Sequence, residues 1–456
     1  MYIYGNSFGY VLQELKPIYH FPPGRNQWQS LFSSVSFLKD PIRVITRNMK
    51  KYSGTYSAVL AGNGKIIITE DPDFIQYVLR ENHTNYQKSP LSTKTAARLF
   101  GSGLLFSNGE PWLKQRRLIQ PGFHHQKIQS LNEIIAKTTK EFIADFPVGE
   151  RIDIYSLMRT LSFAVLIQSL FDIQLSPELI MELNLGFTDM QDFLMKDINQ
   201  PFRKLFYPVN HAERRILSKS RRIRKILKEI ISERLASDAT HHDMLDMLLS
   251  SRYENGERME EEQIIDEILV LLFAGHETTA NTLSWLLYLL ATHPEEAGKL
   301  KASIEKTDIL ESPGNEYINA VINESMRLYP AAWMTERVAL KDDHFGSISY
   351  PRGTIIIPFF YGLHRNKNFW EEESRFNPER FMFPDPAQRK KVKNYFPFGA
   401  GPRMCIGNSF AMTEMAFILH AFFSNFEVSP SGDIPGMWPL ITLRPRKLTL
   451  KVRRIC

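Results

Sequence analysis

The sequence is poor in cysteine: its 456 residues contain two, Cys405 and Cys456. Two thiols cannot build a four-cysteine zinc or iron–sulfur site, and they cannot form the disulfide framework of a small secreted protein. Proteins without structural disulfides are typical of reducing compartments. We therefore expect a cytoplasmic protein.

An excess of charge of one sign is also missing. The chain has 56 basic and 50 acidic side chains, a formal net charge of +6, which is too weak to indicate a nucleic-acid partner. Residues 1–21 contain no apolar run of the length that a signal peptide or anchor needs, so we expect neither export nor a membrane anchor. A hydrophobic content of 43% excludes a disordered chain and is ample for a large core.

One long apolar segment is present, residues 268–291, and its length would suffice to cross a bilayer. Glu277 lies near its middle, where an acid in a membrane is costly, so a helix buried in a protein core fits better. His276 and Glu277 also begin a zinc-protease motif, but Ala280 occupies the place of the second histidine. The zinc interpretation is therefore excluded.

Helical periodicity dominates residues 71–330. Short strands are expected at residues 56–60 and 65–69, joined as a hairpin by a Gly-Asn-Gly turn that lacks the third glycine of a dinucleotide-binding loop. Further predicted elements are strands at 347–350 and 354–358, a helix at 407–423, and a hairpin at 440–452. No linker divides the chain. The prediction is a mainly α fold with a small β-rich N-terminal region, in one domain over residues 1–456.

Basic residues cluster in two places. Residues 211–234 alternate basic and apolar side chains with the spacing of an amphipathic surface helix, and no aromatic stacking residues accompany them, which argues against nucleic-acid binding. The second cluster precedes Cys405 and consists of Arg389, Lys390, Lys391 and Lys393.

Cys405 lies in an unusual local sequence, Phe-Pro-Phe-Gly-Ala-Gly-Pro-Arg-Met-Cys-Ile-Gly over residues 396–407. Glycines and a proline favour a tight loop, and a helix is expected directly afterwards. Loop amides and a helix N-terminus would both stabilise a thiolate. The segment is therefore suited to hold a soft metal ligand.

This loop resembles the haem-ligand loop of the cytochrome P450 family, Phe-x-x-Gly-x-Arg-x-Cys-x-Gly. The fixed positions here are Phe398, Gly401, Arg403, Cys405 and Gly407. The resemblance implies the cytochrome P450 fold, with Cys405 as the axial thiolate ligand of the haem iron, donating electron density that favours O–O cleavage. No Cys-x-x-Cys-His motif occurs, so we expect haem b (iron protoporphyrin IX) held without a covalent link.

The segment Ala-Gly-His-Glu-Thr-Thr at residues 274–279 adds to the resemblance. The family's pattern implies that Gly275 leaves room for dioxygen, that Thr278 hydrogen-bonds the bound dioxygen, and that Glu277 relays protons through water. From the residues alone, the Thr278 hydroxyl could equally bond back to its own helix.

Glu324 and Arg327 are three residues apart and share one helix face, so they can form an ion pair. The resemblance adds Arg380, from the segment Pro-Glu-Arg-Phe, as the third member of a structural triad that supports the cysteine loop.

The two haem propionates need cationic or hydrogen-bonding partners. Trp112 and Arg116 lie one helical turn apart, as they do in the family, and the resemblance also assigns Arg403 and Arg337 to the propionates.

The resemblance implies a monooxygenase, which inserts one atom of O2 into an organic substrate, for example by hydroxylation or oxidative dealkylation. It places a mostly apolar set of residues above the haem: Leu104, Leu105, Phe273, Ala274, Ala332, Trp333, Met334 and Ile441. These favour a lipophilic substrate such as a fatty acid, terpenoid or steroid. A polar, O-methylated substrate stays open, because Ser92, Thr93, Lys94 and Thr95 precede Leu104 and could anchor it.

No fused reductase is expected after the last strands, so electrons would come from a separate ferredoxin or flavodoxin-type protein. Such partners are acidic, and the cluster at residues 389–393 with Lys114 and Arg117 is the predicted docking patch. Two alternatives remain: a haem-thiolate isomerase or dehydratase that needs no external electrons, and a non-catalytic haem gas sensor. The pair Glu277 and Thr278 argues against both, because the resemblance assigns it to oxygen activation.

Overall fold

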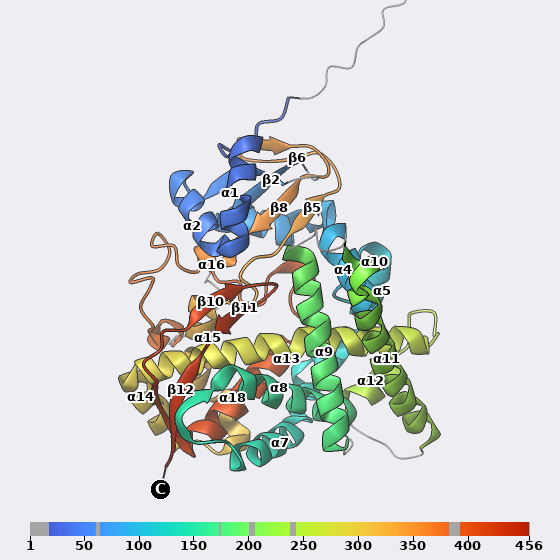
Figure 1. Cartoon of the computed structure of the whole chain (residues 1–456), viewed down its shortest axis with the longest axis vertical. Coiled ribbons are helices and arrows are strands. Elements are labelled where there is room, and N and C mark those ends of the chain that lie inside the picture. The colour runs from blue at the N-terminus through green and yellow to red at the C-terminus, as the bar shows by residue number, and fades with distance from the viewer. Residues whose placement is uncertain are drawn as a thin grey trace, which may run out of the picture.

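The computed structural model describes residues 18–60, 64–172, 175–199, 206–237, 243–382 and 393–455. A large helical part carries a smaller β-rich part at one end (Figure 1). The helices are α1 Gln27–Lys39, α2 Pro41–Lys51, α3 Pro72–Gln76, α4 Pro90–Phe100, α5 Gly109–Ile119, α6 His125–Gln129, α7 Asn132–Ala144, α8 Ile154–Phe171, α9 Pro177–Asn199, α10 Tyr207–Asn210, α11 Ala212–Ala236, α12 Met244–Ser250, α13 Glu261–Thr292, α14 Pro294–Ile304, α15 Glu316–Leu328, α16 Phe360–Leu363 and α18 Asn408–Phe423. The strands are β1 Thr55–Leu60, β2 Gly64–Thr69, β3 Tyr86–Gln87, β4 Gly149–Asp153, β5 Arg337–Ala339, β6 Asp343–Phe345, β7 Ile348–Tyr350, β8 Ile355–Pro358, β9 Phe426–Pro430, β10 Gly436–Pro439, β11 Leu443–Arg446 and β12 Thr449–Arg454. The mainly α prediction is confirmed.

The main sheet combines strands from two distant parts of the chain, in the order β1-β2-β8-β5-β3. The predicted hairpin is present, since β1 and β2 pair antiparallel, and β2 continues into a parallel pair with β8. Ile67 belongs to one buried cluster, whereas Ile66 and Ile68 belong to another. Because successive side chains of a strand point to opposite faces, both faces of this sheet are covered.

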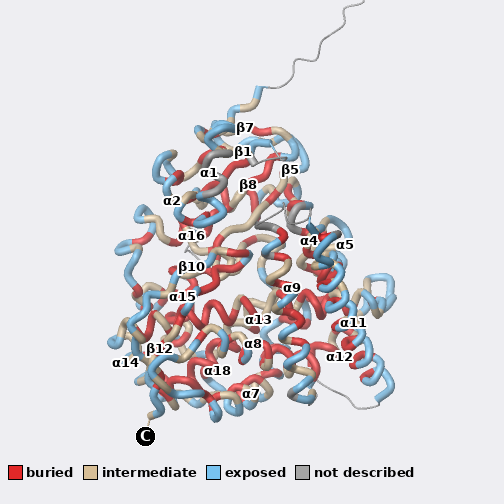
Figure 2. The backbone as a smooth tube through the Cα atoms, viewed as in Figure 1, coloured by how far each residue is buried: buried red, intermediate tan, exposed pale blue. Residues whose placement is uncertain are grey.

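Helix α13 runs through the middle of the helical part (Figures 1 and 2). Most of its residues between 264 and 291 are buried, which confirms the predicted core helix. Its main packing partner is α8. In the described part of the chain, α8 itself is the helix whose length and hydropathy would allow a membrane span, but 61% of that stretch is buried inside the protein.

The predicted hairpin at residues 440–452 is wrong. Strand β11 pairs with β10, whereas β12 lies in another sheet between β4 and β9. The alternation in the sequence is real, because Leu443, Leu448, Leu450 and Val452 are buried. Alternation identifies the buried face of a strand, however, and does not identify its pairing partner.

Helix α11 has the predicted amphipathic character, with isoleucines such as Ile223 buried beneath a basic outer face. Its basic residues meet acids of the neighbouring helices: Arg222 pairs with Glu182 of α9 at 2.8 Å, and Lys228 pairs with Glu261 of α13 at 2.7 Å. The basic cluster is therefore used in helix packing, which agrees with the interpretation as a surface helix.

Candidate haem site

The cysteine loop folds tightly in front of α18. The Cys405 amide donates to the Phe398 carbonyl at 2.9 Å, and the Met404 amide donates to the Gly401 carbonyl at 3.0 Å. Gly401 has a φ of +69°, and a Cβ there would lie 1.7 Å from the Leu79 carbonyl oxygen. Only glycine fits at that position, so the tight shape of the loop follows from the local sequence.

The Cys405 side chain faces a cavity of about 420 Å³ that α13 lines from the other side. Burial raises the pKa of the thiol, while the Gly407 amide and the cations Arg116 and Lys88 act in the opposite direction. Arg116 also fastens the loop, because its Nη1 donates to the Met404 carbonyl at 2.9 Å. The sulfur thus has donors and positive charge around it that stabilise a thiolate once a metal replaces the proton.

Four cations line the same cavity: Lys88, Arg116, Arg337 and Arg403. Their hydrogen bonds in the described part of the chain go to neutral oxygens, such as the Leu105 carbonyl for Lys88 at 3.0 Å and carbonyl or amide oxygens for Arg403. Burial and repulsion by neighbouring cations lower the pKa of Lys88 to about 7 and that of Arg403 to about 9. Burial lowers the pKa of Arg337 to about 10, although Glu336 acts in the opposite direction. A buried cationic cluster of this kind calls for an anionic ligand.

The donor set therefore fits a haem with two propionates. Trp112 completes it, since the Arg403 guanidinium lies 3.8 Å from the centre of the indole ring. The resemblance assigned Trp112, Arg116, Arg337 and Arg403 to the haem propionates, and the structure places all four around one cavity. Lys88 was missed, because a lone lysine between a strand and a helix carries no pattern that distinguishes it from a surface lysine.

The cavity lining contains seven of the eight residues expected near the substrate: Leu104, Leu105, Phe273, Ala274, Ala332, Met334 and Ile441. Trp333 is the exception. Its side chain is buried in the core beside the sheet, and its indole N–H donates to the Leu440 carbonyl at 2.8 Å. Thr93, Lys94 and Thr95 do not line the cavity either, and the Ser92 side chain lies outside the described residues.

Glu277 and Thr278 both line the cavity from α13. The Thr278 hydroxyl donates to the Ala274 carbonyl at 2.8 Å, which is the bond back to its own helix that the sequence left open. Glu277 is held by the β10–β11 hairpin: its Oε1 accepts from Thr442 Oγ1 at 2.8 Å and from Arg444 Nη2 at 2.9 Å. Arg444 was missed, since it lies 167 residues away in sequence.

Gly275 lies at a close contact between two helices. Its backbone lines the cavity, and a Cβ at this position would lie 2.8 Å from Leu166 Cδ2 on α8. The glycine thus permits the close packing of α8 against α13. The role that the resemblance implies for Gly275, making room for dioxygen, stays a prediction.

The predicted triad lies behind the cysteine loop. Glu324 and Arg327 are fully buried and form two parallel bonds, Nε to Oε2 at 2.7 Å and Nη2 to Oε1 at 2.8 Å. Arg380 approaches Glu324 less closely, at 3.5 Å. Arg327 also donates to the carbonyls of His364, Glu373 and Arg375, so one guanidinium ties α15 to a long loop.

His364 connects this triad to the cysteine loop. Its Nε2 accepts a bond from the Phe396 amide at 2.9 Å, at the start of the loop segment. Burial and the nearby Arg327 and Arg365 lower the pKa of His364 to about 3, so the ring is neutral and can accept. The chain from Glu324 through His364 to Phe396 supports the loop from behind.

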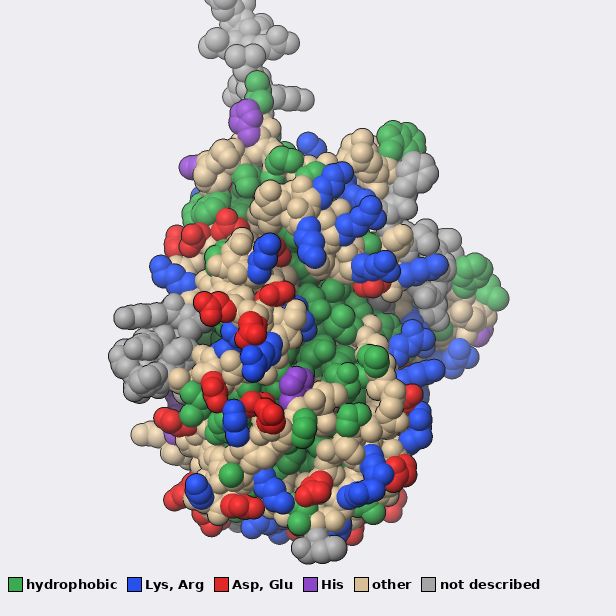
Figure 3. All heavy atoms as spheres, turned by 90° about the vertical axis from the view of Figure 1, so that its left-hand side faces the viewer, with side chains coloured by type: hydrophobic (Ala, Val, Ile, Leu, Met, Phe, Trp, Pro, Cys, Tyr) green, Lys and Arg blue, Asp and Glu red, His purple; other side chains and the backbone are tan. Residues whose placement is uncertain are grey.

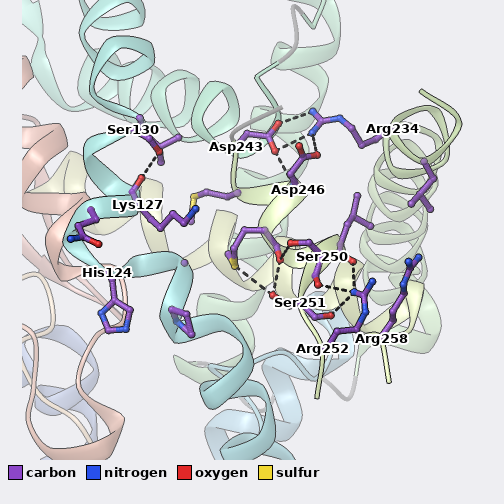
Figure 4. Close-up of a pocket in the computed structure, with 18 of the residues that line it drawn as sticks. His124, Lys127, Ser130, Arg234, Asp243, Asp246, Ser250, Ser251, Arg252 and Arg258 are labelled. Atoms are coloured by element: carbon purple, nitrogen blue, oxygen red, sulfur yellow. Dashed lines mark hydrogen bonds and ion pairs between the residues drawn. The ribbon is translucent and has the colours of Figure 1, made fainter. Parts of the chain in front are cut away.

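A second, larger cavity of about 1050 Å³ opens at the surface between α6, α12 and the end of α11 (Figure 4). Its charged side chains satisfy one another: Arg234 pairs with Asp243 at 2.7 Å and with Asp246 at 2.6 Å. Arg252 donates to carbonyls at the end of α12. This groove has no thiol among its described residues, and it does not share the chemistry of the first cavity.

Comparison with known proteins agrees with this geometry. A family model described as "Cytochrome P450" matches residues 22–452. The chain is 34% identical over 392 residues to cyclooctat-9-en-7-ol 5-monooxygenase of Streptomyces melanosporofaciens, and this match covers 84% of each protein. It is 26% identical to pentalenene oxygenase of Streptomyces avermitilis, with 84% of this chain and 86% of that protein covered. A crystal structure of a cytochrome P450 superposes with a TM-score of 0.80 at 24% identity, covering 91% of this chain and 98% of that one. The chain belongs to the cytochrome P450 family of haem-thiolate monooxygenases.

Proposed function

We propose that this monooxygenase oxidises a lipophilic cyclic hydrocarbon, with a terpenoid as the favoured class. The observation that carries the proposal is the cavity itself, in which the Cys405 thiol, the pair Glu277 and Thr278, and a predominantly apolar wall meet. Two relatives carry names of terpene-oxidising enzymes, which supports the same class. The absence of Thr93, Lys94 and Thr95 from the lining weighs against the polar alternative.

In this proposal Cys405 would bind the iron of a non-covalent haem b as a thiolate, and Lys88, Arg116, Arg337 and Arg403 would hold the propionates. Bound haem supplies the reductive activation of dioxygen. The remaining chemistry belongs to the protein. The apolar wall orients the substrate and keeps water away from the reacting bond.

Proton delivery is assigned to Glu277, which lies at the cavity edge with its carboxylate fixed by Arg444 and Thr442. The Thr442 hydroxyl lines the cavity as well, so it connects the acid to the cavity interior. Thr278 has its proton engaged with the Ala274 carbonyl and therefore offers its oxygen as an acceptor. A water placed between these groups can pass protons from Glu277 inward.

The cavity opens toward the surface near the β10–β11 hairpin. Ile441 lines the cavity and is also 42% exposed, and Met437 and Trp438 are exposed beside it. Figure 3 shows apolar side chains gathered in the middle of the face that lies on the left-hand side of Figure 1. We assign this apolar opening to the entry of a lipophilic substrate.

The experiment uses haem-loaded protein, a surrogate reductase system and a panel of cyclic terpenes, terpene alcohols and polar O-methylated compounds. Substrate-dependent consumption of NAD(P)H with oxygenated product supports the proposal. Product formed without reductant would indicate the isomerase or dehydratase class, and ligand binding without turnover would indicate a sensor. A panel in which only polar O-methylated compounds are oxidised would overturn the terpenoid class.

A pair of variants tests the assignment of Thr278. Thr278→Val should release reducing equivalents as hydrogen peroxide, because protons no longer arrive at the right place. Thr282→Val is the matched control, since Thr282 lies one helical turn further on, lines the same cavity, and donates to the Thr278 carbonyl at 3.0 Å. Equal peroxide yields from the two variants would contradict the assignment.

The proposed electron donor is a separate, acidic ferredoxin or flavodoxin-type protein in the cytoplasm. Lys114 and Arg117 are exposed on α5, the helix that fastens the cysteine loop through Arg116, and Lys393 is exposed at the start of the segment leading to Cys405. The rest of the predicted patch, Arg389, Lys390 and Lys391, lies outside the described residues.

Charge reversal tests this docking patch. Lys114→Glu with Lys393→Glu should slow reduction by the donor at low salt, and the difference should shrink as salt screens the charges. Lys50→Glu with Lys51→Glu, on exposed positions of α2, makes the same change of charge elsewhere and should have no effect. Unchanged kinetics in the first variant would count against the patch.

A further inference from the structure

The loop between α4 and α5 forms one wall of the cavity and packs directly on α13. Leu104 and Leu105 of this loop line the cavity. The approach to α13 is close, because a Cβ at Gly101 would lie 2.0 Å from Asp266 Oδ1 and a Cβ at Gly103 would lie 2.7 Å from the Asp266 carbonyl oxygen. Glycine is needed at both places for the loop to lie where it does.

Two consecutive acids of α13 bind the backbone of this loop. Asp266 Oδ2 accepts the Ser102 amide at 2.6 Å, and Glu267 Oε2 accepts the Leu104 amide at 2.8 Å. Hydrogen bonds to a carboxylate are stronger than those between neutral groups. The loop is thus held to α13 at two neighbouring points, directly beside the residues that face the cavity.

Each acid is itself fixed by a neighbour. Arg224 of α11 forms an ion pair with Asp266, and Gln263 Nε2 donates to Glu267 Oε1 at 2.7 Å. Glu267 is fully buried, and this burial raises the pKa of its carboxyl to about 7. A buried acid carries a desolvation penalty that an apolar side chain would avoid, so its contribution lies in the bond to the loop.

The opposite side of the loop is held as well. Lys88 donates to the Leu105 carbonyl at 3.0 Å, and Arg403 donates to the Ser107 carbonyl at 2.9 Å. These two cations belong to the cluster assigned to the haem. The loop therefore spans from the cationic cluster to the two acids on α13, and its shape depends on both ends.

We propose that Asp266 and Glu267 are positioning residues that fix residues 101–105 as a rigid wall of the cavity and thereby set which substrates fit. The proposal rests on the proposed function, because it takes the cavity as the substrate site. With the wall fixed, Leu104 and Leu105 match one ligand shape. With the wall released, the preferred ligand binds less tightly and bulkier ligands gain access.

Amide hydrogen exchange of the haem-loaded protein, resolved by mass spectrometry for residues 100–107, tests the attachment. In Glu267→Ala the Leu104 amide loses its acceptor and should exchange about tenfold faster. Glu267→Gln keeps a carbonyl acceptor and should stay close to wild type. Glu262→Ala is the control, since Glu262 is exposed on the same helix and bonds Arg224 but not the loop.

Spin-state titration with the terpene panel tests the consequence. Glu267→Ala should weaken binding of the best ligand about tenfold and reduce its preference over bulkier ligands, whereas Glu267→Gln and Glu262→Ala should bind as wild type does. Asp266 is less buried than Glu267, so Asp266→Ala serves as a second variant if Glu267→Ala does not take up haem. In Asp266→Ala the exchange rate of the Ser102 amide is measured, because Asp266 is its acceptor.

Unchanged exchange of both amides in these variants would overturn the proposal, and so would faster exchange with an unchanged order of ligand preference. The outcome is separable from that of the proposed function. If no terpene shifts the spin state of the wild type, the terpenoid class fails, while the exchange comparison still decides whether the acids hold the loop.

Discussion

The ion pair between Arg444 and Glu277 joins the β10–β11 hairpin to the middle of helix α13. The side chains are 8% and 10% exposed, and Arg444 reaches Glu277 Oε1 through Nη2 at 2.9 Å and Nε at 3.2 Å. Burial alone would lower the pKa of Arg444, but Glu277 and Tyr155 raise it on balance, so the arginine is charged. Replacing Arg444 by Met should therefore leave a buried carboxylate without its main partner.

The magnitude follows from the geometry. Two charges about 4 Å apart in an effective dielectric of about 20 attract by about 4 kcal/mol. Removing one partner of a buried pair costs about 3–5 kcal/mol, because the other charge stays behind. Asp192 adds little to this value, since it is 42% exposed and lies 3.4 Å from Arg444.

A double-mutant cycle measures the pair. Arg444→Met and Glu277→Gln should each destabilise the protein in urea unfolding followed by circular dichroism, and the double variant should be about 1–3 kcal/mol more stable than the sum of the two losses predicts. Arg446→Met, two residues along the same strand at an exposed position, is the control and should change stability little. Losses that add within about 0.5 kcal/mol would refute the coupling.

Three further outcomes are expected. Burial raises the pKa of Glu414 from 4.5 to about 8, so the native state binds this proton more tightly than the unfolded chain, and the free energy of unfolding falls as the pH rises from 4.5 through 8. In Glu414→Gln, the free energy of unfolding measured across this pH range should fall less. A fall identical to that of the wild type would contradict the raised pKa of Glu414. Arg327→Lys should destabilise the protein by about 3 kcal/mol or more and weaken haem retention, since lysine cannot form the paired bonds to Glu324 and also reach three carbonyls. A variant that unfolds and loses haem as the wild type does would argue against the role of the triad. Trp333→Phe should lower the melting temperature without altering ligand preference in spin-state titrations, because Trp333 lies in the core outside the cavity lining, and a changed preference would contradict that placement.

The features that the sequence could predict depend on residues close together in the chain. The cysteine loop and the pair Glu324 and Arg327 each lie within a short segment, so their spacing alone fixes a shared loop or helix face. The long buried helix was identified by its uninterrupted apolar pattern.

The features that sequence reasoning missed depend on contacts between distant segments. Arg444 meets Glu277 across 167 residues, and Glu267 meets Leu104 across 163. Lys88 reaches the cavity only because the loop before α4 folds inward. The close contact of Gly275 with Leu166 of another helix was missed for the same reason. Such contacts leave no periodic signal in the sequence.

The roles assigned to this cavity all depend on Cys405 binding the haem iron as a thiolate. The most direct measurement is the absorption spectrum of the reduced protein under carbon monoxide, for the wild type and for Cys405→His. The wild type should show the red-shifted Soret band of thiolate ligation, and the variant should lose it. A wild-type band at the position of a histidine-ligated haem would contradict thiolate ligation by Cys405.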